Sequence, residues 1–225
     1  MNNTILIVAA HPDDEVLGMG GAIARYVHAG DAVYVLFLGD GVTSRGEMKE
    51  KEVLFRRDCA EQAARILGAN IFSFGTFPDN RFDTVSFLDI VQFVEKAKNE
   101  VRPDKIFTHH GGDLNIDHRL TLQAVLTAFR PQPQERFSAI YSFEVNSSTE
   151  WSHPAILPVF VPDTFVDIAP FVKKKLEAYS CYEAEVRPDP HARSLKAVEC
   201  LAQKRGREVG LEYAEAFMTL RHIVR

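Results

Sequence analysis

The sequence is poor in cysteine and has no pattern that would pair the cysteines it has. Its three cysteines, Cys59, Cys181 and Cys200, are odd in number and widely spaced, and no two of them form a Cys-x-x-Cys pair. This spacing argues against a disulfide framework and against a cysteine zinc site. Reduced thiols in a cytoplasmic protein are the simplest interpretation.

The sequence also lacks a lysine- and arginine-rich run, and its formal net charge is −5. This argues against nucleic acid as a partner, because binding it requires a basic stripe. The apolar run at residues 5–10 is far shorter than a signal-peptide core or a membrane span. We expect a cytoplasmic protein without a membrane span. Its 225 residues can bury a core without a structural metal, so a bound metal would serve chemistry.

Short apolar runs alternate with helical patterns along most of the chain. The runs at residues 4–10 and 32–38 are rich in β-branched and other apolar side chains, as is typical of strands buried on both faces. Strands are predicted at 4–10, 32–38, 70–74, 105–108, 139–143 and 164–168, and helices at 16–29, 47–67, 87–101, 118–129, 171–182 and 191–204. The alternation predicts an α/β fold: a Rossmann-like, doubly wound, mostly parallel sheet with helices on both faces. Residues 1–225 are expected to form a single domain with an elaborated C-terminal part.

An unusual density of charge follows the first predicted strand, where the sequence reads His-Pro-Asp-Asp-Glu over residues 11–15. Ligands bind at the carboxyl ends of strands in open parallel sheets, and a divalent cation would relieve the repulsion among three carboxylates. A second histidine-rich stretch, residues 108–118, follows a later strand. A hydrogen-bonded loop pair, or acidic capping of a helix by Glu15, remains the alternative explanation. Two clusters at two strand ends favour a metal site.

The segment Ala-His-Pro-Asp-Asp-Glu at 10–15, followed by Gly-Met-Gly-Gly at 18–21, resembles the signature of the PIG-L/LmbE-like deacetylases. The resemblance extends to Leu-Gly at 67–68, Phe-Pro-Asp at 77–79 and Asp-His at 117–118. It implies a zinc-dependent hydrolase that removes the N-acetyl group of an N-acetylglucosamine-like sugar conjugate. It covers most of the chain and also allows a zinc amidase that cleaves a different amide of such a conjugate.

The resemblance assigns roles to particular residues. His11, Asp14 and His118 match the family's zinc ligands, and Asp13 matches the general base that acts on the water activated by zinc. Asp117 is expected to orient His118 by accepting a hydrogen bond from the ring nitrogen that does not bind the metal, as ligating histidines usually require. Glu15 is expected to support the ligands in the same way, without binding the metal itself. His and Asp ligands suit Zn²⁺ and also Fe²⁺.

One position departs from the family pattern. The family's second motif often reads His-Pro-Asp-His, whereas residues 115–118 read Asn-Ile-Asp-His. Asn115 can donate a hydrogen bond to an oxyanion, but it cannot deliver a proton at neutral pH. Asp13 would then serve as base and acid, or His109 or His110 would supply the proton.

The substrate-binding candidates are Arg56, Asp79, His109 and His110. Arg56 lies where similar family members place a substrate-contacting arginine, with a surface helix arginine as the alternative. Asp79 could bond sugar hydroxyls or simply form the turn. The implied partner is a small amino-sugar conjugate, and a homo-oligomer is compatible with the resemblance. A nucleotide-binding Rossmann protein is disfavoured, because acidic residues stand where a Gly-rich fingerprint would be needed.

Overall fold

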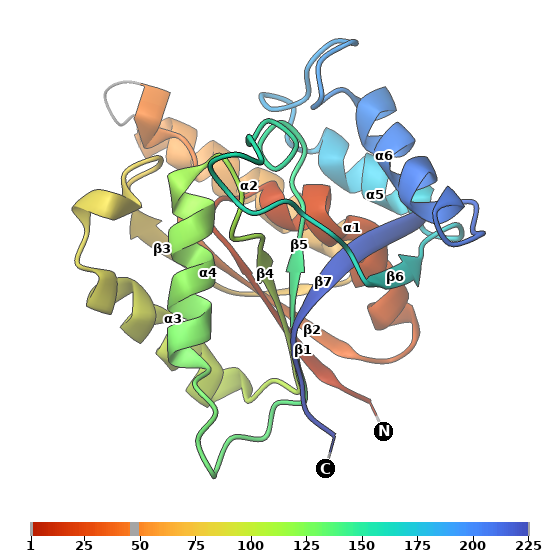
Figure 1. Cartoon of the computed structure of the whole chain (residues 1–225). Helices are drawn as coiled ribbons and strands as arrows, with labels where there is room; N and C mark the ends of the chain where they lie inside the picture. The colour runs from red at the N-terminus through yellow and green to blue at the C-terminus, as the bar shows by residue number, and fades with distance from the viewer. Residues whose placement is uncertain (1, 46–49, 225) are drawn as a thin grey trace.

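The structure, a computed structural model, describes residues 2–45 and 50–224. Within these residues, seven strands form one sheet in the order β3-β2-β1-β4-β5-β7-β6 (Figure 1). The strands β1 to β5 run parallel, β7 is antiparallel to β5, and β6 is antiparallel to β7. The strand bounds are β1 Thr4–Ala9, β2 Ala32–Gly39, β3 Asn70–Phe77, β4 Lys105–His109, β5 Ala139–Phe143, β6 Thr164–Asp167 and β7 Ala214–His222.

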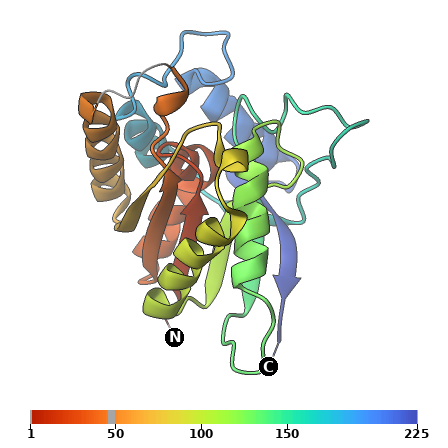
Figure 2. The ribbon, with the colours of Figure 1, turned by 90° about the vertical axis from the view of Figure 1, so that its left-hand side faces the viewer.

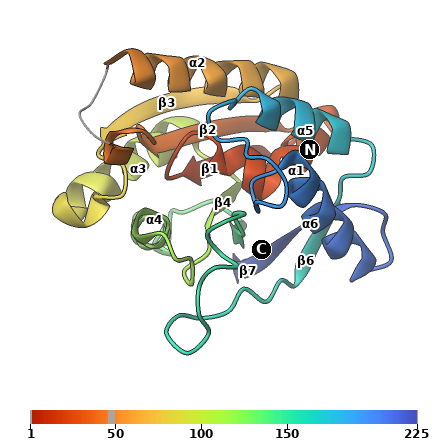
Figure 3. The ribbon, with the colours of Figure 1, turned by 90° about the horizontal axis from the view of Figure 1, so that it is seen from above.

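Helices cover both faces of this sheet (Figure 3). Their bounds are α1 Asp14–His28, α2 Glu50–Leu67, α3 Phe87–Val101, α4 Ile116–Ala128, α5 Val172–Ser180 and α6 Leu195–Arg207. Alternate residues of β1 point to opposite faces, as the pleat of a strand requires. Ile5 and Ile7 pack with α1, α2, α5 and α6, whereas Leu6 and Val8 pack with α3 and α4. The predicted doubly wound, mostly parallel α/β fold is confirmed.

The strand order reverses direction between β1 and β4, which are hydrogen-bonded neighbours. Helix α1 follows β1 on one face, and α4 follows β4 on the other. In Figures 1 and 2 the start of β1 and the end of β7 lie at the lower edge, opposite the edge where β1 and β4 end. Such a reversal leaves a crevice at the carboxyl ends of the two strands, and ligands bind there in this class of sheet.

Several boundaries differ from the prediction. Strand β7 was not predicted, although it lies between β5 and β6 in the sheet. The helix predicted over 191–204 is α6, which begins at Leu195 because the hydroxyl of Ser194 accepts the Ala197 N–H and caps the helix. Helix α4 begins at Ile116, two residues before the predicted start. Helix α2 begins at Glu50, and residues 47–49 of its predicted span lie outside the described residues.

Helix α1 is broken at Met19, whose φ of −154° and ψ of 27° are not helical. The glycines around this break let the helix approach the sheet closely. A Cβ on Gly18 would overlap the ring of Phe143 in β5, and one on Gly21 would lie 2.7 Å from Ile168 Cδ1. The Gly-Met-Gly-Gly segment is therefore a packing requirement that brings the N-terminus of α1 against the sheet.

A buried ion pair satisfies the backbone groups at this break. Glu215 of β7 accepts the N–H groups of Gly21 (3.1 Å) and Ala22 (2.6 Å). Lys175 of α5 donates to the Leu17 carbonyl (2.8 Å) and to Glu215 Oε1 (2.5 Å). Both side chains are 4% exposed. The strand missed by the prediction thus supplies the carboxylate that supports α1.

None of the helices in residues 2–45 and 50–224 combines the length and the apolar composition that a membrane crossing needs.

Candidate metal centre

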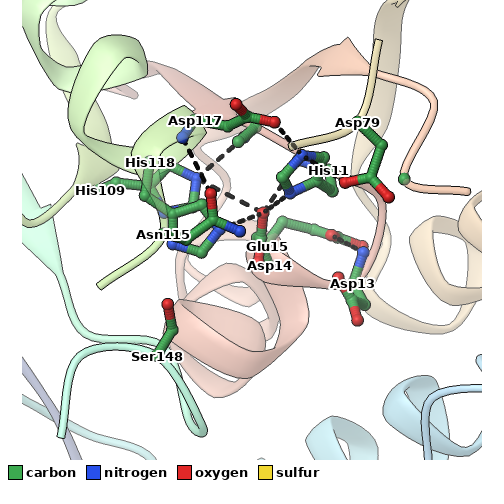
Figure 4. Close-up of polar contacts among 12 residues, drawn as sticks. His11, Asp13, Asp14, Glu15, Asp79, His109, Asn115, Asp117, His118 and Ser148 are labelled. Atoms are coloured by element: carbon green, nitrogen blue, oxygen red, sulfur yellow. Dashed lines mark hydrogen bonds and ion pairs between the residues drawn. The ribbon is translucent and has the colours of Figure 1, made fainter. Parts of the chain in front are cut away.

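Three buried side chains meet at the carboxyl ends of β1 and β4. His11 follows β1, Asp14 is the first residue of α1, and His118 lies in the first turn of α4. Asp14 Oδ2 lies 3.5 Å from His11 Nδ1 and 3.4 Å from His118 Nε2. One ligand atom from each residue lies within 4.8 Å of the others (Figure 4). The structure therefore brings together the three residues predicted as metal ligands.

The two separations from Asp14 to the histidines are those expected around a tetrahedral cation. Separations of 3.4 and 3.5 Å are too long for good hydrogen bonds. Bonds of about 2.0–2.1 Å to one tetrahedral zinc ion would place neighbouring ligand atoms about 3.3–3.4 Å apart. In addition, Asp14 Oδ1 is buried without a hydrogen-bond partner. A buried carboxylate oxygen is costly when unpaired, and a cation would satisfy it.

The partner of His118 is not the residue predicted. Asp113 Oδ2 lies 3.1 Å from His118 Nδ1, which leaves Nε2 directed at Asp14. Asp113 is itself fixed by the hydroxyls of Ser148 and Thr149. Asp117 precedes His118 on the same helix, where neighbouring side chains point in different directions and cannot face each other. Asp113, in the turn before α4, replaces Asp117 in the predicted role.

Asp117 instead holds His11. Its Oδ2 lies 2.9 Å from His11 Nε2, and its two oxygens also accept the backbone N–H groups of Asn80 (2.6 Å) and Phe82 (3.0 Å). Asp79 Oδ1 lies 3.2 Å from the same His11 nitrogen. His11, Asp79 and Asp117 could also surround a cation. The backbone bonds already occupy Asp117, so this set is better suited to orienting His11 through Nε2 and leaving Nδ1 for the metal.

The carboxylates create a strongly negative environment. Burial by itself would lower the pKa of both histidines. Nevertheless, the pKa of His118 is raised to about 9 by Asp14 and Asp113, and that of His11 is raised well above 6.5 by Asp117 and Asp14. The pKa of Asp14 is held well below its usual value, because the histidines outweigh the effect of burial. The same carboxylates would also favour a divalent cation at this centre.

Asp13 lies beside the triad with a strained backbone. Its φ is 122°, a region that residues other than glycine rarely adopt. Glu15 Oε2 accepts the Asp13 N–H (3.0 Å), and Tyr182 donates its hydroxyl to Glu15 Oε1 (2.6 Å). Burial raises the pKa of Asp13 to about 6 against the opposing effect of Arg193 and Arg56. A carboxylate with such a pKa suits general base catalysis near neutral pH.

Asn115 caps α4 with its side chain. Its Oδ1 accepts the Asp117 N–H (2.8 Å), and this bond commits the amide oxygen and leaves Nδ2 as the free donor end. Figure 4 shows the amide directed at the cluster that contains Asp14 and His11. Asn115 Nδ2 could therefore donate a hydrogen bond to an oxygen near the triad, and the predicted role in binding an oxyanion stays a prediction.

Three of the predicted substrate residues are buried and make their polar contacts within the protein. His109 is fully buried, stacks on His118 with ring centroids 3.9 Å apart, and accepts the Ala10 N–H at Nε2. Burial lowers its pKa to about 3, so it is neutral and supplies no proton. His110 is 4% exposed, and its Nε2 lies 2.9 Å from the Pro158 carbonyl oxygen. Arg56 is 5% exposed and donates to Glu185 (2.6 Å) and the Gly41 carbonyl (3.2 Å).

Sequence reasoning missed four residues of this centre. They are Asp113, Tyr182, Glu185 and Arg193. Asp113 stood in the histidine-rich stretch, where only its adjacency to glycines distinguished it. The other three come from the C-terminal part, and no spacing in the sequence connects them with the first motif.

Comparisons with known proteins show which family and which folds this chain is similar to. The family model described as PIG-L: GlcNAc-PI de-N-acetylase matches residues 6–129. The 4-oxalmesaconate hydratase of Pseudomonas putida is 31% identical over 198 residues, which cover 78% of this chain and 71% of the hydratase. The diacetylchitobiose deacetylase of Thermococcus kodakarensis is 27% identical over 226 residues, covering 94% and 80% of the two chains. The solved structure of a 4-carboxy-2-hydroxymuconate hydratase from Pseudomonas putida superposes with a TM-score of 0.78 at 26% identity, covering 100% and 98%.

Proposed function

Since the chain belongs to the PIG-L family, we propose that it is a metal-dependent N-deacetylase acting on an N-acetylglucosamine-like sugar conjugate. The observation that carries this proposal is the buried triad of His11, Asp14 and His118, which the buried Asp13 adjoins in sequence. This arrangement combines a buried carboxylate that can act as a base with a candidate cation site. A Zn²⁺ or Fe²⁺ ion held there would act as a Lewis acid that acidifies a water molecule and polarises an amide carbonyl.

The residues of the chain would carry out the proton transfers. Asp13 takes a proton from the attacking water, whose oxygen bonds to the acetyl carbon. Asn115 Nδ2 donates a hydrogen bond to the carbonyl oxygen as negative charge develops on it. The carbon–nitrogen bond then breaks, and Asp13 returns the proton to the leaving nitrogen, because Asn115 has none to give and His109 is neutral and buried. The products are acetate and a free amine.

Acetate release tests this proposal. The panel contains diacetylchitobiose, an N-acetylglucosaminyl malate and an N-acetylglucosaminyl inositol, each incubated with Zn²⁺-loaded or Fe²⁺-loaded protein. We expect release that Asp13→Asn lowers by about 10²–10⁴-fold while one metal ion still binds. Asp58→Asn is the matched control, because Asp58 is an exposed α2 carboxylate that accepts a bond from Gln62 and should leave the rate unchanged. Tight metal binding without acetate from any conjugate would overturn the assignment.

A hydratase is the second candidate, and two observations favour it. A relative at 31% identity is a hydratase, and position 115 lacks an acid for a leaving amine. Hydration needs no such acid, because the proton that Asp13 takes from water is returned to the carbon adjacent to the new carbon–oxygen bond. We would follow the loss of ultraviolet absorbance of 4-oxalomesaconate under the same conditions. Absorbance loss without acetate release from the conjugates would select this candidate.

A further inference from the structure

The C-terminal part of the chain contributes an arginine to the candidate centre. Arg193, in the loop before α6, donates from Nη1 to Asp13 Oδ2 at 3.0 Å. Its Nε donates to the Ser147 hydroxyl (2.6 Å), and Nη1 also reaches Glu185 Oε2 (3.0 Å). The Arg193 side chain is 20% exposed, whereas that of Asp13 is 3% exposed. Arg193 thus closes over the Asp13 carboxylate and is itself held on two sides.

A second arginine braces this contact from behind. Arg56 donates to Glu185 Oε1 (2.6 Å) and to the Gly41 carbonyl (3.2 Å), so Glu185 bridges the two arginines. The two arginines and the carboxylates of Asp13 and Glu185 form a neutral group of four charges. Three of these side chains are less than 10% exposed. Paired charges this deeply buried persist because each has a fixed partner.

The conformation of Asp13 indicates what this contact does. Asp13 precedes α1, where an aspartate normally caps the helix with its side chain, but its side chain makes no cap bond. Its φ of 122° and the bond from its N–H to Glu15 turn the side chain elsewhere. Figure 4 shows its carboxylate apart from the cluster of His11, Asp14 and His118. Strain of this kind persists only where surrounding contacts impose it.

We infer that Arg193 is a positioning residue that holds the Asp13 carboxylate outside the metal-ligand triad, so that it remains a base and does not become a fourth ligand. This inference rests on the proposed metal-dependent function. It also gives the C-terminal part of the chain a role in the centre. Asp13 is adjacent in sequence to Asp14. Without Arg193, we expect the Asp13 carboxylate to turn towards the cation.

Zn²⁺ titration of metal-stripped protein by calorimetry tests the inference without any substrate. In Arg193→Met we expect Zn²⁺ affinity to rise about tenfold, because the released carboxylate adds a ligand. Adding Asp13→Asn to this variant should return the affinity to the wild-type value. Arg193→Lys should lie between, because a lysine retains the charge but not the forked geometry. Arg205→Met is the matched control, since Arg205 also makes a partly buried pair, with Glu144 at 2.7 Å, and should leave Zn²⁺ affinity unchanged.

Kinetics on whichever substrate is turned over give a second readout. We expect Arg193→Met to lower kcat about 10²-fold with KM changed little, because a base displaced by about 1 Å loses most of its effect. Arg193→Lys should recover part of kcat, and it also serves if the methionine variant fails to fold. Turnover combined with Zn²⁺ affinity that Arg193→Met leaves unchanged would overturn the inference and keep the function. The expected affinity pattern without turnover of any conjugate would support the inference and refute the deacetylase.

Discussion

Replacing Glu215 by alanine would remove the carboxylate that supports the break in α1. The change leaves the Lys175 ammonium buried without its ion-pair partner, and it leaves the Gly21 and Ala22 N–H groups without acceptors. Breaking a buried pair from one side and orphaning buried donors should lower the free energy of unfolding by about 4 kcal/mol. The first half of α1 carries Asp14, so the loss falls on the helix that forms part of the metal centre.

The companion variant, Lys175→Met, should cost less. Glu215 loses its ion-pair partner but keeps both backbone donors, and the Leu17 carbonyl also loses its donor, so we expect about 3 kcal/mol. In the double variant no buried charge remains unpaired. Its free energy of unfolding should therefore exceed the additive expectation by about 2–3 kcal/mol.

Urea unfolding of metal-stripped protein, followed by far-ultraviolet circular dichroism, measures these values by linear extrapolation. Lys196→Met is the control, because the Lys196–Asp189 pair is exposed, with a separation of 3.7 Å, and should contribute less than about 1 kcal/mol. A loss below about 1 kcal/mol in Glu215→Ala, or strict additivity in the double variant, would show that the pair does not stabilise α1.

Two further predictions concern Asp113 in the candidate metal centre and Gly18 in α1. Burial would raise the pKa of Asp113, but His118 and Ser148 lower it from 3.8 to about 2. The contribution of the ionised Asp113 to the free energy of unfolding is therefore present above about pH 4 and is lost as the pH falls through 2. In metal-free protein, Asp113→Asn should therefore cost about 2 kcal/mol at pH 6 and much less near pH 2, measured by urea unfolding across that range; an equal cost at both would contradict the shift. Gly18→Ala should lower the free energy of unfolding by about 1–3 kcal/mol, because its Cβ would overlap the ring of Phe143, and Phe143→Leu in the same chain should recover part of the loss in calorimetry.

The location of the centre could be predicted because it depends on local patterns. An apolar run identified β1 as a buried strand, the alternation of strands and helices indicated β4, and parallel strands present their carboxyl ends at one edge. His11 and Asp14 follow β1 directly, and His118 lies nine residues beyond His109 at the end of β4. A rule of topology therefore sufficed to bring two distant stretches together.

Strand β7 could not be recognised in the same way. Its sequence, Ala-Glu-Ala-Phe-Met-Thr-Leu-Arg-His, has few β-branched residues and carries Glu215 at a buried position. Such a strand depends on pairing with β5 and β6, and propensity for strands is governed largely by such neighbours. The buried charge of Glu215 is stabilised by Lys175 and by the backbone N–H groups at the break in α1, which are distant in sequence.

The sequence by itself determined the fold class and the edge of the sheet where the candidate centre lies, because hydrophobic periodicity gives the order of strands and helices. The three candidate ligands came from the resemblance of two short motifs to the family signature. Only the tertiary structure decided that Asp113 holds His118, that Asp117 holds His11, and that Arg193 reaches Asp13. The physical reason is that a hydrogen bond depends on direction as well as distance. The orientation of a side chain is set by packing between elements that lie far apart in the sequence, and 180 positions separate Asp13 from Arg193.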